Sequence, residues 1–222
     1  MTEPIEPNSP VDLMTIVEGI HHTLGMAVLQ EPVGSRLLDG SFDLDTYIRL
    51  LKQTYHYVRR TAPWLTRAAA RTTNVSLCSL LARKAEEETG HEQWALADLA
   101  ALGVDIGEPE HWPICRAVEA YIAWHDFAIE EIRPEAVLGA AYILERLSEE
   151  HASVLARRLA ERGLGSKASL FMRSHGEADI EHVCALQQAL ASIEDAEIRI
   201  QICLSAQITA SAYLGLLRSV AA

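Results

Sequence analysis

The chain has 222 residues, of which 49% are hydrophobic and 23% are charged, as in an ordinary globular protein. Acidic residues outnumber basic ones by 31 to 19, the formal net charge is −12, and no cluster of Lys and Arg could follow a phosphate backbone. A nucleic-acid partner is therefore not expected. Length and composition predict one folded domain over residues 11–222, preceded by a flexible N-terminal tail over residues 1–10.

The first ten residues, MTEPIEPNSP, are acidic and rich in proline. They have neither the basic region nor the apolar run of a secretory signal, and no later segment approaches the roughly 18 uninterrupted apolar residues of a membrane span. We therefore expect a cytoplasmic protein that does not enter a membrane.

Apolar residues recur at three- and four-residue spacings along the whole chain, and no segment alternates with a period of two. This pattern predicts the all-α fold class. Helices are expected, between Pro and Gly breakers, at residues 11–30, 43–61, 64–72, 75–102, 114–132, 134–162, 167–191 and 194–220. Ser41 to Asp45 predicts a capped helix start, and Gly163 predicts a helix end.

The helix over residues 43–61 carries three neighbouring side chains that are candidates for lining a substrate pocket, namely Tyr55, His56 and Tyr57. A phenol near activated oxygen can donate a hydrogen bond to it or be oxidised by it. Packing in the core or exposure at the surface is the simpler interpretation of several histidines, namely His21, His22, His56, His111, His125 and His151.

Two candidate metal ligands lie in the next long helix, where Glu88 and His91 form a Glu-x-x-His pair. Dimetal carboxylate proteins use this spacing to direct two ligands at the core of one bundle. Glu87 lies four residues before His91 and could take the place of Glu88. Three consecutive glutamates are also typical of a solvated, charged helix face, so this alternative stays open.

Glu145 is a single charge within the otherwise apolar and small-residue segment of the helix over 134–162. A carboxylate on an inward helix face is costly unless it is paired or bound to a metal ion. If the helix were rotated, Glu145 would instead face water.

His175, Asp179 and His182 stand at positions i, i+4 and i+7 of the helix over 167–191, which places them on one face. Imidazole and carboxylate are ligands that suit iron, manganese or zinc. A polar, solvated helix start is the alternative for any one of these residues but explains the triplet less well. The three motifs together supply three imidazoles and three carboxylates, which is enough for two metal ions.

Four segments resemble the heme-oxygenase-like dimetal oxidases. They are EETGH at 87–91 followed by WALADLAALG at 94–103, DTYIRLLKQTYHYV at 45–58, LGAAYILE at 138–145 and HGEADIEH at 175–182. The resemblance spans roughly residues 43–215 and keeps the order of the motifs. It implies a bundle of seven to eight helices similar to heme oxygenase but without heme, related to the TenA thiaminases and to pyrroloquinoline-quinone synthase.

The resemblance further implies a cofactor of two Fe²⁺ ions, with manganese as a second option, and a reaction with O₂. The implied ligands are Glu88, His91, Glu145, His175, Asp179 and His182. Glu145 would bridge the ions, with Glu88, His91 and His182 on one ion and His175 and Asp179 on the other. Some members carry their first carboxylate seven residues before the histidine, where this chain has Lys84.

The implied activity is oxidation of a small metabolite, amino-acid-derived or fatty-acid-like, by N-oxygenation or oxidative C–C cleavage. A metal-free TenA-like hydrolase or a cofactor-independent oxidase on the same fold is the first alternative, and a protein-interaction role is the second. The four cysteines lack the spacing of a zinc or redox motif. We expect buried, reduced thiols at Cys78, Cys115, Cys184 and Cys203, and a homodimer by analogy with the fold.

Overall fold

The computed structural model describes residues 12–165 and 168–221, with the side chains of residues 177–181 left outside the description. The expected tail over residues 1–10 lies outside the described residues. Within the described ranges the chain forms helices, turns and loops and contains no strand, so the all-α prediction is confirmed.

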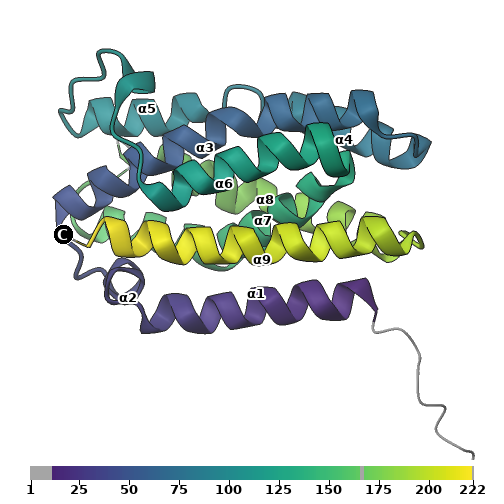
Figure 1. The fold of residues 1–222 in the computed structure, drawn as a ribbon. Coiled ribbons are helices and arrows are strands. Elements are labelled where there is room, and N and C mark those ends of the chain that lie inside the picture. The colour runs from purple at the N-terminus through teal and green to yellow at the C-terminus, as the bar shows by residue number, and fades with distance from the viewer. Residues whose placement is uncertain (1–11, 166–167, 222) are drawn as a thin grey trace, which may run out of the picture.

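The helices, in chain order, are α1 (Leu13–Gln30), α2 (Pro32–Asp39), α3 (Leu44–Arg71), α4 (Val75–Glu88), α5 (Glu92–Ala101), the 3₁₀ turn η1 (Pro109–His111), α6 (Arg116–Phe127), the π turn η2 (Ala128–Ile132), the 3₁₀ turn η3 (Pro134–Ala136), α7 (Val137–Glu161), α8 (Leu170–Ala191) and α9 (Ala196–Ser219). Figure 1 shows them as a bundle in which α9 runs between α1 and α6, while α3, α4 and α5 lie on the far side of α6.

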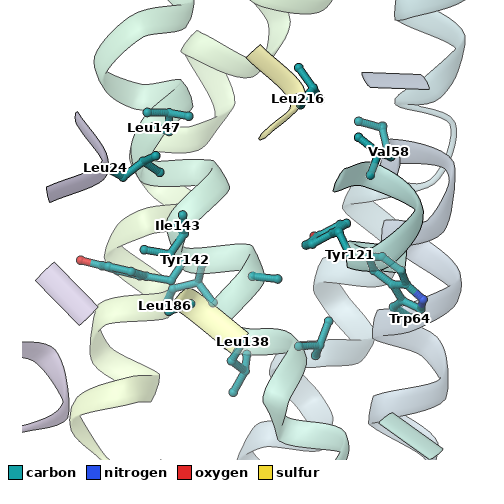
Figure 2. Packing of buried hydrophobic residues seen from close by; sticks show 14 of the residues in the cluster. Leu24, Val58, Trp64, Tyr121, Leu138, Tyr142, Ile143, Leu147, Leu186 and Leu216 are labelled. Atoms are coloured by element: carbon teal, nitrogen blue, oxygen red, sulfur yellow. The ribbon is translucent and has the colours of Figure 1, made fainter. Parts of the chain in front are cut away.

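The centre of the bundle is α7, which packs against α8 on one side and α9 on the other. Its side chains Leu138, Ile143 and Leu147 are at most 4% exposed, and they belong to one buried cluster with residues from other helices such as Leu24 and Leu186 (Figure 2). Burial of each such side chain stabilises the fold by roughly 2 kcal/mol. The core therefore fixes α7, and with it the position of any functional group that α7 carries.

Gly139 lets α7 and α9 approach closely. A Cβ atom added at this position would lie 2.2 Å from the backbone oxygen of Ile202 and 2.9 Å from the backbone nitrogen of Ala206. Backbone atoms cannot yield as a flexible side chain can, so only glycine fits here.

The expected helix break at Pro63 is wrong, because α3 continues through it to Arg71. Proline removes one backbone hydrogen bond and costs about 3 kcal/mol in a helix interior. The turn that follows buries Trp64 and Leu65 to 2% and 0% exposure, which contributes roughly 2–3 kcal/mol for each side chain. Tertiary packing thus outweighs the local preference.

The expected continuous helix over residues 75–102 is also wrong. The chain leaves helix α4 after Glu88 and begins α5 at Glu92, with Gly90 at φ +91° between them. This left-handed conformation favours glycine, which has no Cβ atom to clash with the backbone. The break falls inside the Glu-x-x-His motif, so Glu88 and His91 are not on one helix.

Two smaller expectations need correction. The helix end predicted at residue 30 is confirmed, since α1 ends at Gln30 and Glu31 is extended, but the next residues were not expected to be helical. Pro32 begins α2, where proline takes the first position that suits its fixed φ angle. The cysteines are free, as expected for reduced thiols, but they are not buried: Cys184 is exposed, and the others, Cys78, Cys115 and Cys203, are half-buried.

Helix α9 is long and apolar enough to cross a membrane by length and composition, with a mean hydropathy of 1.4. It packs against α1, α6 and α7, and its residues Ile202, Ala206 and Leu217 are at most 1% exposed. Core helices of bundles share this composition, so the observation is weak as an indication of a membrane span. The expectation that the protein does not enter a membrane stays a prediction.

A side chain from α5 caps the start of α8. The carboxylate of Asp98, which is 0% exposed, accepts hydrogen bonds from the backbone N–H groups of Leu170 at 2.8 Å and Phe171 at 3.0 Å. Burial raises the pKa of Asp98, although the two hydrogen bonds oppose that change. This contact joins helices that are about seventy residues apart in the chain and fixes where α8 begins.

His125 on α6 is fully buried and bonded through both ring nitrogens. Its Nδ1 lies 2.9 Å from the carbonyl oxygen of Tyr121, its Nε2 lies 3.0 Å from the Ser205 hydroxyl on α9, and Trp64 stacks on the ring. Burial lowers the pKa of His125 to about 4. A neutral imidazole is therefore part of the packing between α3, α6 and α9.

Replacement of Asp98 by alanine should lower the free energy of unfolding by about 2–3 kcal/mol, because it leaves two buried N–H groups without acceptors. Urea denaturation measures this loss. Asp195 is the matched control, since it caps α9 in the same way at an exposed position; Asp195→Ala should cost only about 1 kcal/mol. Equal losses in the two variants would contradict the assigned role of Asp98.

Acidification should destabilise the protein through His125. The unfolded chain takes up the proton near pH 6.5 and the folded chain near pH 4, so stability is complete above 6.5 and falls as the pH drops towards 4. Between about pH 7 and pH 4.5 this residue should account for a loss of about 2–3 kcal/mol. Denaturation of His125→Phe over the same range should lack this part of the loss; an unchanged pH dependence would show that His125 is not responsible.

Candidate metal centre

The turn between α4 and α5 brings together two of the proposed ligands. Glu88 is the last residue of α4 and His91 directly precedes α5; both side chains are 7% exposed. Nδ1 of His91 lies 3.2 Å from Oε2 of Glu88. Gly90, which has a left-handed backbone conformation, turns the chain between the two residues. This turn, and not helical spacing, brings Glu88 and His91 together.

His175 on α8 completes a first group. The donor atoms of Glu88, His91 and His175 all lie within 4.8 Å of one another. Nδ1 of His175 lies 3.0 Å from the carbonyl oxygen of Phe171, and because a carbonyl can only accept, the neutral ring carries its hydrogen on Nδ1 and its lone pair on Nε2. This is the tautomer that presents Nε2 to a metal ion.

Trp94 holds the two imidazoles of the first group in place. Its ring stacks on His91 at a centroid distance of 3.9 Å and meets the edge of His175 at 5.2 Å. The rings of His91 and His175 are themselves 5.0 Å apart and nearly perpendicular. The indole therefore limits the rotation of both ligands.

A second group shares Glu88 with the first. The donor atoms of Glu88, Glu145 and His182 also lie within 4.8 Å of one another. We expected Glu145 to be the carboxylate common to both ions, whereas the geometry makes Glu88 the common residue. His175 lies with His91, and His182 lies with Glu145, which differs from the expected division. Asp179, which we expected as a further ligand, lies outside the described side chains.

Glu145 is in contact with a lysine. Nζ of Lys84, on α4, lies 2.7 Å from Oε1 of Glu145, on α7, and the two residues are 1% and 8% exposed. Burial of Glu145 agrees with the inward orientation that we considered for it. The buried ion pair was not expected from the sequence, which singled out Lys84 only as a departure from the ligand pattern.

Glu87 lies at the edge of the centre. Its carboxylate is 3.4 Å from Nε2 of His182 and 3.7 Å from Nε of Arg83. Glu88, not Glu87, belongs to both ligand groups. Burial alone would raise the pKa of Glu88, but the neighbouring His91, His175 and Lys84 outweigh it, and the pKa lies below its ordinary value. Glu88 is thus held as a carboxylate, the form that binds metal ions.

A cavity of about 140 Å³ adjoins the centre. Glu88, Glu145 and His175 line it, and most of its remaining wall is apolar, with residues such as Leu50 and Leu155. Of the three aromatic candidates, Tyr57 lines the cavity, while Tyr55 packs on Trp112 and His56 is buried beside Tyr55. His151, which we had assigned to packing or the surface, also lines the cavity; no motif in its surroundings could have indicated this.

The residues present fit a divalent transition-metal ion. The first group offers one carboxylate and two imidazoles, a donor set typical of iron sites. Nδ1 of His91 is buried and lies 3.2 Å from Oε2 of Glu88, so the donor atoms of these two candidate ligands lie close together. The second group has comparable donors, but one of them, Glu145, already faces the ammonium of Lys84.

Solved structures share this architecture. A domain of unknown function with a heme oxygenase-like fold from Shewanella denitrificans superposes with a TM-score of 0.83 at 21% identity, over 96% of this chain and 93% of that one. A TenA homologue from Pseudomonas syringae gives 0.79 at 13% identity over 98% and 99%, and a CADD-like protein of unknown function from Nostoc punctiforme gives 0.69 at 16% identity over 94% and 96%. At such identities the likeness concerns the fold.

No curated protein sequence matches the chain well enough to count as a relative. A family model described as "iron-containing redox enzyme" matches residues 48–214, which is three quarters of the chain and includes Glu88, His91, Glu145, His175 and His182. The chain has a heme-oxygenase-like fold and belongs to this family of iron-containing redox enzymes.

Proposed function

We propose that the protein is a non-heme di-iron enzyme that activates O₂ to oxidise a small metabolite. The observation that carries the proposal is the pair of His and carboxylate groups that share Glu88 beside a cavity. The family to which the chain belongs supports iron as the metal. The first ion would be held by Glu88, His91 and His175, and the second by Glu145 and His182, with Asp179 proposed as a further ligand.

Bound ferrous iron would supply the electrons that reduce O₂. The protein holds the ligands in fixed orientations, Glu88 as a carboxylate and His175 with its lone pair on Nε2. The mostly apolar wall of the cavity would limit water near the ions and so protect reactive oxygen species from side reactions. Tyr57 lines the same cavity and would contact a bound substrate.

The cavity favours a substrate with an apolar body and one polar group directed at the ligands. Among the described residues that line it there is no Lys or Arg, so the metal ions would be the main positive partner of a substrate carboxylate. Fatty-acid-like and amino-acid-derived compounds both fit this description. The corresponding reactions would be oxidative C–C cleavage and N-oxygenation.

A metal-free hydrolase is the alternative function, favoured by the likeness to the TenA homologue. Such an enzyme would need a nucleophile at the cavity. All four cysteines lie in the described part of the chain, and none of them lines the cavity. In this alternative the buried Glu88, His91 and His175 would transfer protons and would not hold metal ions.

Replacement of His91 by alanine should raise the Kd of the tightest Fe²⁺ at least about 100-fold, because loss of even an outer-shell partner of a metal ligand costs 10–100-fold. Anaerobic titration with Fe²⁺ followed by metal quantification measures the effect, and O₂ consumption by the loaded protein measures activity. His111→Ala is the matched control, since His111 is an exposed histidine outside the centre, and this variant should bind iron as the wild type does.

Failure of the wild type to bind Fe²⁺, or equal binding by the His91→Ala variant, would contradict the iron centre. In the first case, hydrolytic activity of the metal-free protein would support the alternative function. Thermal unfolding of each metal-free variant checks that a variant which does not bind iron is still folded.

A further inference from the structure

We propose that the ammonium group of Lys84 takes the place of the second metal ion, so that the chain holds one ion tightly and admits a second only when Lys84 leaves Glu145. This inference rests on the proposed iron centre and deepens it, because it names the residue that controls its occupancy. The observation behind it is the buried ion pair between Lys84 and Glu145.

Burial makes the placement of Lys84 unusual. Lysine is almost never fully buried unless its charge is paired, and Lys84 is 1% exposed. Lys84 lies one turn before Glu88 on α4, and Nζ lies 2.7 Å from Oε1 of Glu145. The side chain thus places a positive charge beside a proposed ligand of the second group.

The positive charge at this position opposes a second cation. A divalent ion bound by Glu145 would lie within a few ångströms of the ammonium, in an interior that screens charge much less than water does. The ammonium and the ion therefore compete for the same carboxylate. The first group, Glu88, His91 and His175, does not include Glu145, so its ion keeps all three of its ligands while the ammonium is paired with Glu145.

The alternative arrangement needs only a movement of one side chain. Lysine carries its charge on a flexible four-carbon stem, so Nζ can leave Glu145 while α4 and α7 stay in place. A second ion would bind in this second arrangement, at the cost of moving the ammonium out of its ion pair. Occupancy of the second position therefore depends on metal concentration in a range where the first position is already full.

Titration with Mn²⁺, followed by the electron paramagnetic resonance signal of the free ion, tests this inference. The wild type should bind one Mn²⁺ tightly, whereas Lys84→Met should bind two, with the second at least about 100-fold tighter than in the wild type. Lys52→Met is the matched control, because it removes a half-buried lysine on α3 outside the centre, and it should bind one ion tightly.

Wild-type protein that binds two ions with similar affinity, or a Lys84→Met variant that binds no more ions than the wild type, would overturn the inference. If methionine prevents folding, Lys84→Gln provides a second uncharged variant of similar length. If neither variant folds, the number of ions that the wild type binds tightly decides whether the inference holds. Two equally tight ions would leave the proposed iron centre intact, whereas no Mn²⁺ and no Fe²⁺ in any variant would remove both proposals.

Discussion

Two carboxylates, Glu88 and Glu145, are buried within reach of each other inside a helical bundle, and their negative charges require positive partners there. Within the described structure those partners are the ammonium of Lys84 and the imidazoles that surround Glu88. Packing alone does not account for two neighbouring buried carboxylates, since apolar side chains of similar size would fold at least as well. The need of these two negative charges for positive partners is therefore the best physical argument that the bundle holds a functional centre.

The rest of the fold serves to keep these groups at a fixed distance. The close contact of α7 with α9 at Gly139 fixes the helix that carries Glu145, and Asp98 fixes the first turn of the helix that carries His175. Trp94 restrains the two imidazoles. Because each of these contacts joins segments far apart in the chain, the ligand positions depend on tertiary packing and not on any single motif.

The all-α class and the segments that carry the candidate ligands could be predicted from the sequence, because apolar periodicity and His or carboxylate spacing are local features. The continuity of α3 through Pro63 could not, since buried Trp64 and Leu65 outweigh the proline only in the folded state. The ion pair of Lys84 could not be predicted from the neighbouring sequence either, because its partner Glu145 lies on another helix. The grouping of the candidate ligands also differs from the expected division, because it depends on how α4, α7 and α8 face each other.

The central claim is that Glu88, His91 and His175 bind iron. Diffraction from crystals loaded anaerobically with Fe²⁺, recorded on both sides of the iron absorption edge, tests it most directly. The account predicts an anomalous peak among these three side chains, with any peak at Glu145 and His182 weaker. A protein that takes up iron but shows its strongest peak elsewhere, or shows none in the bundle, would contradict the account.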